Sequence, residues 1–463
     1  MLNCFDVCKV LLAALLFLAC SAATARAYTI AFEHGNLISM ESDAVHVDQR
    51  VIVRDGEIAA IEPSAMAPSL PVDETIDATG RYLVPGFIDT HFHWRNDVRS
   101  ELSLAVANGI TTVLNMGVLR CQDHAGLRRA IAAGEILAPR YFTTGPMLKR
   151  HDVKTSADAA PLVGEHKALR YDFVKIHDNL PRDGYEALIA EAARQGMAVI
   201  GHGQHHLPLQ ASLRMKSISH AEEFMYIFSA AQRRDLAFLA QAAKQIKASG
   251  MYVAPTLGTF DMIRRHADPQ LFAALAAEDQ LKYLPRGHVE YWQSDRVRFR
   301  SNPHFSAPES LERLQRELQW QMEFTRLLHE TGVPLLAGSD NDGLHVPGFA
   351  LHRELELLNQ AGLAQLDVLK AATINPARFL GIADTTGSIA TGKAADLVLL
   401  EANPLADIRN TRRVGGVMLA GRWLDRQQLD EVLAGVERTD QRSCASGTDA
   451  ILCATSCLLG ASF

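Results

Sequence analysis

The chain has 463 residues, of which 48% are hydrophobic and 21% charged, a composition typical of a globular protein with room for a large barrel and an accessory domain. Its formal net charge of −7 provides no basic surface for nucleic acid or anionic lipid, so neither is an expected partner. A small-molecule or dipeptide substrate is expected instead.

The first 27 residues match the pattern of a secretory signal peptide. Lys9 precedes the apolar run Val10–Ala19, which is too short to span a bilayer, and Ala25-Arg26-Ala27 places small residues at a cleavage site. We therefore predict that residues 1–27 are removed near Ala27 and that the mature chain is secreted to the periplasm. Cys20 also sits in a lipoprotein-like context, so a membrane partner is expected only if Cys20 is lipidated.

The remaining cysteines, Cys121, Cys444, Cys453 and Cys457, are too few and too scattered for a disulfide scaffold. An oxidising compartment would still permit a bond among the three near the C-terminus. No CxxC pair suggests a thiolate zinc site. A metal site would therefore have to use histidine, carboxylate or a less common ligand.

Both ends of the mature chain are rich in predicted strands. Residues 51–61 form two β-rich runs around Asp55-Gly56, which is a strong hairpin signal. Further strand-like runs cover 396–400 and 417–422. We predict a small β-sandwich domain built from residues 28–83 and 384–430, followed by a tail, 431–463, of unknown structure.

The middle of the chain, residues 84–383, alternates strand-like and helical patterns. Predicted helices cover 98–107, 185–195 and 311–330. Eight strand candidates lie at 86–93, 111–114, 140–144, 172–177, 198–201, 217–219, 251–257 and 333–338. The alternation predicts an α/β fold of the TIM-like (β/α)8 barrel type, in which chemistry takes place at the C-terminal ends of the strands. Residues 258–310 exceed an ordinary loop and are partly helical at 270–284, so we predict a lid over the barrel mouth.

Histidines and a lysine occupy several of these strand ends. On a strand, His91 and His93 point to the same face, although an isolated HxH pair is a weak motif. In Asp172–His177 the apolar Val174 and Ile176 would face the surrounding helices, which turns Lys175 inward.

Three more predicted strands end at a polar residue: His202, His220 and Asp340. Each has an ordinary explanation as a solvated side chain, a turn or a cap. In a closed barrel, however, all of them converge on one mouth. Four imidazoles and a carboxylate suit zinc, with manganese, cobalt or iron as alternatives. Lysine could take part only if neutral or modified, for example as a carbamate formed with CO2.

These motifs resemble the amidohydrolase superfamily, in particular the imidazolonepropionase-like enzymes that include Xaa-Pro dipeptidases of the prolidase kind. The resemblance spans about residues 28 to 430. It rests on PGFIDTHFH, DFVKIHD, GHG, SISHAEEF, AGSD and the long run from ELELLNQAG to LVLLEANPL.

The resemblance implies one metal ion held by His91, His93 and Asp340, and a second held by His202 and His220. It also implies two zinc ions per chain, bridged by a carbamate on Lys175, with Asp340 taking the proton from a bridging water. The sequence departs from the family pattern in Gly-Ser-Asp at the eighth strand and in His177 after the lysine. Neither departure removes a ligand.

The favoured hypothesis is a metal-dependent amidohydrolase that hydrolyses amide or peptide C–N bonds of dipeptides or N-acyl amino acids through a metal-bridging hydroxide. The alternative is a mononuclear cyclic-amide hydrolase or deaminase, in which Lys175 is structural. A remote alternative is a ligand-binding barrel without chemistry.

A dipeptidase must also recognise a free carboxylate. Tyr226, six residues after His220, is one candidate for this contact, although it could equally pack in the core. The insertion offers others in Arg264, Arg265, His266 and Arg286. A homo-oligomer is compatible with the sequence.

Overall fold

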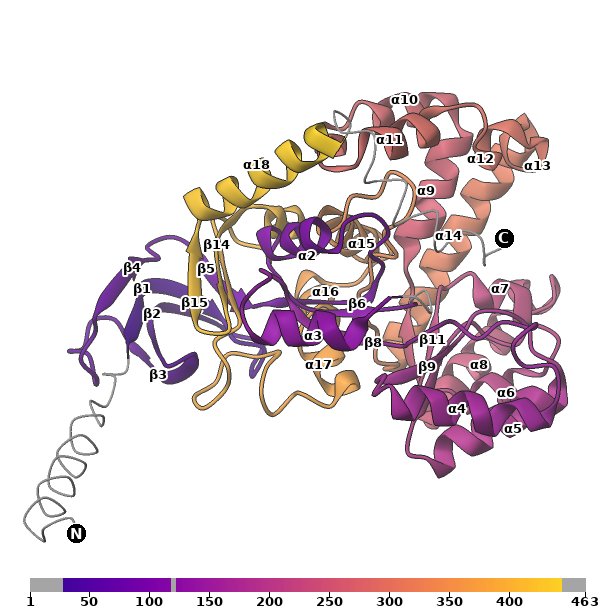
Figure 1. Cartoon of the computed structure of the whole chain (residues 1–463), viewed down its shortest axis with the longest axis horizontal. Helices are drawn as coiled ribbons and strands as arrows, with labels where there is room; N and C mark the ends of the chain where they lie inside the picture. The colour runs from indigo at the N-terminus through magenta and orange to yellow at the C-terminus, as the bar shows by residue number, and fades with distance from the viewer. Residues whose placement is uncertain (1–27, 118–121, 444–463) are drawn as a thin grey trace, which may run out of the picture.

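The computed structural model describes residues 28–117 and 122–443. The predicted signal peptide with Cys20, the four remaining cysteines and the tail after Ser443 lie outside the described residues. The chain has a mixed α/β fold in which strands from both ends gather on one side and parallel strands with their helices form the remainder (Figure 1). Within the described ranges, no helix has the length and apolarity needed to cross a bilayer.

One eight-stranded sheet combines the two ends of the chain. Its order is β15-β14-β13-β5-β1-β2-β3, with β4 beside β1, and Leu399 of β13 pairs with Leu83 of β5. The predicted hairpin is present between β2 and β3, because Asp55 and Gly56 take the positive φ values of 52° and 81° that such a tight turn needs. The strand bounds are β1 (Thr29–Ile38), β2 (Val45–Arg54), β3 (Glu57–Pro63), β4 (Glu74–Asp77), β5 (Tyr82–Pro85), β13 (Leu397–Leu400), β14 (Val414–Leu419) and β15 (Arg422–Asp425).

The middle of the chain carries two parallel sheets, β6-β7-β8 and β12-β11-β10-β9. Backbone hydrogen bonds join the two sheets through neighbouring segments. Leu148 N, beyond β8, donates to Lys175 O of β9 (2.8 Å). Thr90 N of β6 donates to Ala337 O (3.1 Å), in the segment that lies beside β12. The strand expected at 333–338 is reduced to a parallel bridge between Leu335 and Val253. The bounds are β6 (Phe87–Phe92), β7 (Ile110–Asn115), β8 (Arg140–Thr143), β9 (Phe173–Ile176), β10 (Ala198–Gly201), β11 (Ser217–Ser219) and β12 (Tyr252–Ala254).

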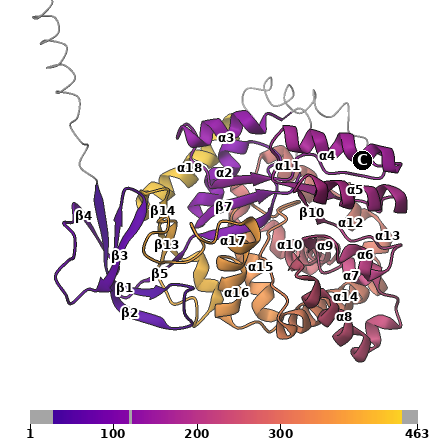
Figure 2. The same ribbon diagram turned by 90° about the horizontal axis from the view of Figure 1, so that it is seen from below.

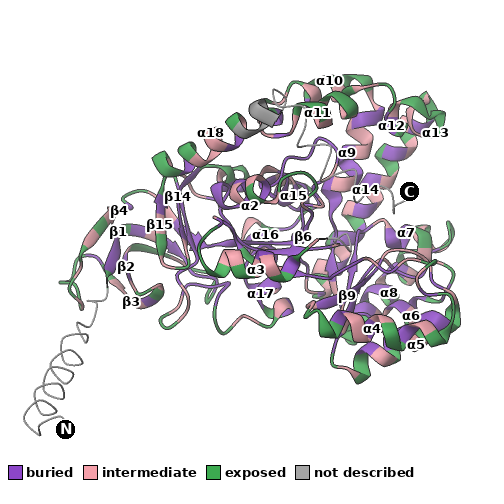
Figure 3. Cartoon of the chain, viewed as in Figure 1, coloured by how far each residue is buried: buried purple, intermediate pink, exposed green. Residues whose placement is uncertain are grey.

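Helices cover the outside of these strands, with buried faces inward and exposed faces outward (Figures 2 and 3). Val174 and Ile176 pack into the large core under the helices, whereas Phe173 points to the opposite side, where its ring stacks on Phe379 at 5.3 Å. The alternation expected at β9 is therefore observed. The helices are α2 (Val98–Ala107), α3 (His124–Ala132), α4 (Ala159–Ala168), α5 (Arg182–Arg194), α6 (Leu209–Ser212), α7 (Glu223–Ile227), α8 (Leu236–Ser249), α14 (Pro308–Thr331), α15 (Phe349–Gln360), α16 (Gln365–Ala371) and α17 (Ile374–Leu380), with short 3-10 helices η1 (Ser156–Asp158), η2 (Gln232–Arg234) and η4 (Ile408–Arg412).

The insertion is more helical than the sequence pattern suggested. Its helices include α10, where Asp268 accepts hydrogen bonds from Gln270 N and Leu271 N ahead of Pro269, a strong start signal. The start of the predicted tail is also helical, because α18 (Arg426–Ser443) runs from β15 across α2 toward the insertion (Figure 1). The insertion contains α9 (Leu257–Ala267), α10 (Pro269–Ala276), η3 (Asp279–Tyr283), α11 (Arg286–Gln293), α12 (Arg298–Ser301) and α13 (Pro303–Ser306).

Candidate metal centre

Two buried histidines at the end of β6 lie next to the partly buried Asp340. Asp340 Oδ1 is 3.4 Å from His91 Nε2 and 3.3 Å from His93 Nε2. The ligand atoms of the three side chains lie within 4.8 Å of one another, so the group could hold a metal ion. His91 also has a buried Nδ1 with no partner among the described residues.

The segment after Gly338 is held tightly against β6. Asp340 takes a left-handed φ of 39°, and its backbone N donates to His91 O at 2.7 Å. A Cβ at Gly338 would come within 2.6 Å of the Cβ of His91, so only glycine permits this approach. Asn341 fixes the neighbouring histidine, because its Oδ1 accepts from His93 N at 2.8 Å and its Nδ2 donates to His93 O.

Asp89 supports the same junction from the interior. One oxygen of its fully buried carboxylate accepts from His91 N (3.1 Å) and from Ser339 N (2.9 Å). Burial raises the pKa of Asp89 to about 6, against the lowering effect of these hydrogen bonds. The side chain therefore ties β6 to the segment that carries Asp340.

Lys175 points inward from β9, as its strand pattern predicted. Its Nζ donates to Met116 O at 2.8 Å and lies 3.4 Å from His91 Nε2. Burial lowers the pKa of Lys175 to about 8, which increases the neutral fraction of the amine. Gly201, with φ of 114°, makes this packing possible, because a Cβ there would lie 2.2 Å from Ile176 O.

His202 and His220 complete the cluster, with ring centroids 4.8 Å apart. The ring of His220 is also 4.8 Å from that of His91, and its Nδ1 is 3.7 Å from Asp340 Oδ2. Thr256 Oγ1 lies 2.6 Å from Nδ1 of His220. Both His220 and Thr256 have positive φ values, 71° and 43°, a strained backbone of the kind that gathers at functional sites.

Glu223 orients His202 from the start of α7. Its carboxylate lies 3.0 Å from His202 Nδ1, 2.7 Å from His205 Nε2 and accepts from Gly203 N at 2.7 Å. Burial would raise the pKa of Glu223, but His202 and His205 hold it at about 2. With Nδ1 engaged, His202 has its Nε2 left for a ligand or a metal ion.

The electrostatics suit a cation. Burial lowers the pKa of His93 to about 4 and of His220 to about 3, so these imidazoles are neutral at pH 7 and can offer a lone pair. Burial would raise the pKa of Asp340, but His91 and the other histidines keep it well below its usual range. The carboxylate is therefore ionised, and its Oδ2 accepts from Thr259 Oγ1 at 2.9 Å. Neutral imidazoles around an anionic carboxylate form a donor set that fits a divalent cation.

The structure thus brings together all six residues expected at strand ends: His91, His93, Lys175, His202, His220 and Asp340. The residues that support these six were not predicted, although Asp89 and Glu223 lie within the motifs PGFIDTHFH and SISHAEEF. Asn341, Thr256 and Thr259 carry no comparable signal, because small polar residues are common in turns and helix starts throughout a chain.

Tyr226 is exposed and does not pack in the core. Its side chain is 52% exposed, and its ring is 4.9 Å from that of His205. The basic residues of the insertion have partners elsewhere: Arg264 pairs with Asp261, Arg265 with Glu278 and Arg286 with Glu290, and Arg300 donates to His266.

Comparison with known proteins gives a consistent family signal. The model of the amidohydrolase family matches residues 82–424. Ochratoxinase of Aspergillus niger is 24% identical over 400 residues, covering 78% of each chain. Among solved structures, a Xaa-Pro dipeptidase with bound methionine is 19% identical at a TM-score of 0.65, covering 86% of this chain and 100% of its own. Bottromycin amidohydrolase is 25% identical at a TM-score of 0.71, covering 90% and 92%.

Proposed function

The chain belongs to the amidohydrolase family, and we propose that it is a metal-dependent hydrolase of amide or peptide C–N bonds in small substrates such as dipeptides or N-acyl amino acids. The observation that carries the proposal is the convergence of four imidazoles, an ionised aspartate and an inward lysine in one cluster. The names of the Xaa-Pro dipeptidase and of bottromycin amidohydrolase support this bond type.

We further propose a (β/α)8 barrel over residues 84–383 and a composite β-sandwich over 28–83 and 384–430. Hydrogen bonds that join β9 and β6 to the segments beside the other sheet support closure of the barrel. The single sheet that contains both β1 and β13 supports the composite domain. The signal-like residues 1–27 support a periplasmic location.

The metal proposal assigns one ion to His91, His93 and Asp340 and a second to His202 and His220. Lys175 would bridge them as a carbamate, formed when its neutral amine adds to the carbon of CO2 and releases a proton. Zinc fits these nitrogen and oxygen donors, with manganese, cobalt or iron as alternatives. When bound, such ions supply Lewis-acid polarisation of the scissile carbonyl and lower the pKa of water.

Asp340 is the proposed proton carrier. Its Oδ1 faces His91 and His93 (3.4 and 3.3 Å), and its Oδ2 is held by Thr259, so the carboxylate has a fixed orientation. A carboxylate held in this way can take a proton from the attacking water and deliver it to the leaving amine.

Tyr226 is the proposed contact for the substrate carboxylate. Its exposed ring lies next to His205, whose Nε2 is 2.7 Å from Glu223. The hydroxyl remains a neutral donor, because partial burial and nearby carboxylates, Glu222 first among them, raise the pKa of Tyr226 above its usual value of 10.

The test is elemental analysis of the mature chain, residues 28–463, together with a panel of dipeptides and N-acyl amino acids. We expect about two transition-metal ions per chain in the wild type, and loss of metal and of hydrolysis in Lys175→Ala. Lys167→Ala is the control, because Lys167 is an exposed residue of α4.

About one ion per chain, unaffected by Lys175→Ala, would instead favour the mononuclear cyclic-amide hydrolase or deaminase. A metal-loaded protein that is inert toward amides, cyclic amides and bases would favour the non-catalytic barrel.

A further inference from the structure

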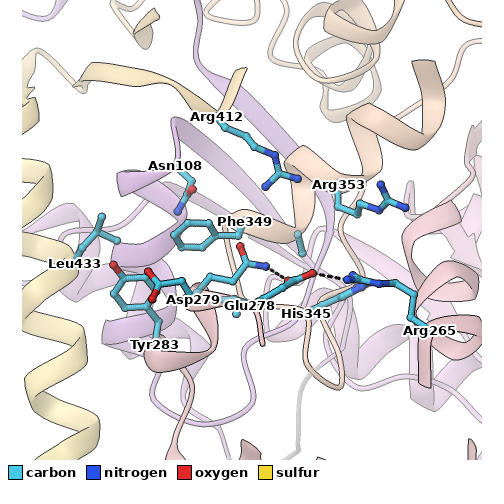
Figure 4. Close-up of a pocket in the computed structure, with 13 residues that line it drawn as sticks. Asn108, Arg265, Glu278, Asp279, Tyr283, His345, Phe349, Arg353, Arg412 and Leu433 are labelled. Atoms are coloured by element: carbon cyan, nitrogen blue, oxygen red, sulfur yellow. Dashed lines mark hydrogen bonds and ion pairs between the residues drawn. The ribbon is translucent and has the colours of Figure 1, made fainter. Parts of the chain in front are cut away.

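A cavity of about 520 Å³ lies outside the metal centre (Figure 4). It is bordered by α9 and η3 of the insertion, by α15 and by Leu433 of α18. None of the six residues of the metal centre lines it. Its volume falls in the range of small-molecule binding sites.

One wall of the cavity is apolar and aromatic. The rings of Tyr283 and Phe349 stack with centroids 5.6 Å apart and planes 14° apart. Val346 and Leu433 extend this wall. Such a surface can hold a flat apolar body of a ligand.

A network of five charged side chains reaches the opposite side. Asp261 pairs with Arg264 (2.8 Å) and with Arg353 (2.8 Å). Glu356 pairs with Arg353 (3.3 Å) and with Arg412 (2.7 Å). Three guanidinium groups therefore share two carboxylates, which leaves one positive charge without a counter-charge inside the network. The other charged lining residues, Arg265, Glu278 and Asp279, are neutralised in the pairs Arg265–Glu278 and Asp279–Lys282.

Arg412 lies at one end of this network and can bind an anion. It binds Glu356 through Nε, and its two terminal nitrogens have no hydrogen-bond partner in the described part of the chain. Its side chain points inward among the lining residues (Figure 4).

His345 adds unused hydrogen-bonding capacity. It also lines the cavity, is only 6% exposed, and neither ring nitrogen has a partner among residues 28–117 and 122–443. Buried polar groups usually have a partner, so an imidazole without one at a cavity wall points to an occupant.

We propose that this cavity is a second binding site, which takes a small organic carboxylate with an aromatic body. Its carboxylate lies at Arg412 and its ring against Tyr283 and Phe349. The assignment does not depend on the hydrolytic function, because the two sites share no residue.

The probes are benzoate, phenylacetate and 3-phenylpropionate, titrated calorimetrically into the full mature protein. Benzamide tests the need for the charge, and inorganic phosphate tests the need for the apolar body. We expect saturable binding of at least one of the three acids, with benzamide and phosphate at least about tenfold weaker, since a hydrogen bond between charged groups contributes that much.

Arg412→Gln should weaken acid binding by about tenfold or more and leave hydrolysis unchanged. Arg412→Lys, which keeps the charge but loses the planar pair of donors, should weaken acid binding less than Arg412→Gln. Arg409→Gln is the matched control, because Arg409 lies on the same 3-10 helix, pairs with Asp407 and does not line the cavity. Its binding should equal that of the wild type.

If Arg412→Gln failed to fold, Phe349→Ala would take its place, with the same expected weakening and Phe305→Ala as its control. The proposal is overturned if none of the three acids binds, if phosphate or benzamide binds as tightly as the best acid, or if acid binding persists in Arg412→Gln. Acid binding that persists in Arg412→Gln and disappears when metal is removed by a chelator would take place at the metal centre.

Discussion

The carboxylate of Glu223 lies 3.0 Å from Nδ1 of His202, on the side of the ring opposite the Nε2 that remains for a ligand. This contact fixes the tautomer and orientation of a histidine whose side chain is 17% exposed. The residue that orients the histidine follows it by 21 positions in the chain.

We therefore expect Glu223→Gln to weaken metal binding by about 10- to 100-fold and to lower kcat/KM in parallel. Metal titration with a chromogenic chelator competitor measures the affinity. Glu186→Gln, on the exposed face of α5, should change neither quantity. Full metal affinity in Glu223→Gln would show that the contact does not position His202.

Asp340 and Asp342 provide a matched pair for the proton-transfer role. Asp340→Asn should lower kcat by about 100-fold or more, because the amide cannot accept a proton at neutral pH. Asp342 lies two residues away, is 37% exposed and pairs with Arg95 at 3.3 Å, so Asp342→Asn should stay within a few-fold of the wild type. Steady-state kinetics on the best substrate of the panel measures kcat for both variants. Equal kcat values would show that Asp340 does not transfer the proton.

Gly201 allows β10 to approach β9 beside Lys175. In Gly201→Ala the added Cβ would lie 2.2 Å from Ile176 O, and the alanine would have to adopt a φ of 114°. We therefore expect the free energy of unfolding to fall by about 2 kcal/mol or more. Urea denaturation gives the value. Gly164→Ala, in α4 with open space around its Cβ, should be neutral or slightly stabilising. Equal stability of Gly201→Ala and the wild type would contradict this account.

Glu354 should make stability depend on pH. Its carboxyl is fully buried, Oε2 accepts from Gly258 N at 2.8 Å, and Oε1 has no partner among the described residues. Burial raises the pKa of Glu354 to about 8 from an ordinary value of 4.5. The folded state holds the proton on Glu354 more tightly than the unfolded state does. The stability that this proton provides is therefore fully present below pH 4.5 and is lost as the pH rises toward 8.

Glu354→Gln keeps an acceptor for Gly258 and removes the titration. We expect the variant to exceed the wild type in stability at pH 8 by about 2–4 kcal/mol and to match it near pH 5. Denaturant unfolding at several pH values measures the difference. Glu323→Gln, on the exposed face of α14, should follow the wild type at every pH. A constant offset between Glu354→Gln and the wild type would rule out the titration.

Local pattern determined the elements that carry the centre. The two-residue spacing placed His91 and His93 on one face of β6, and the apolar neighbours of Lys175 turned it inward, because strand periodicity is a property of adjacent residues. The hairpin at Asp55-Gly56 follows for the same reason, since positive φ at two successive positions is a local requirement.

The insertion shows where local pattern was too weak. Short helices such as α12 and α13 have four residues each, too few for a helical period to be visible. Packing against each other, α9 and α14 stabilises them.

The sequence by itself therefore identified the six residues of the cluster, although the segment before Asp340 forms a single bridge and not the expected strand. Only the tertiary structure decided what holds them: Asn341 reaches His93 across 248 positions, and Asp89 reaches Ser339 across 250. It also decided that Arg353 and Arg412 meet at one carboxylate beside a cavity. Periodicity reports only on neighbours along the chain, whereas these contacts form when distant segments close on one another, and no local pattern encodes that closure.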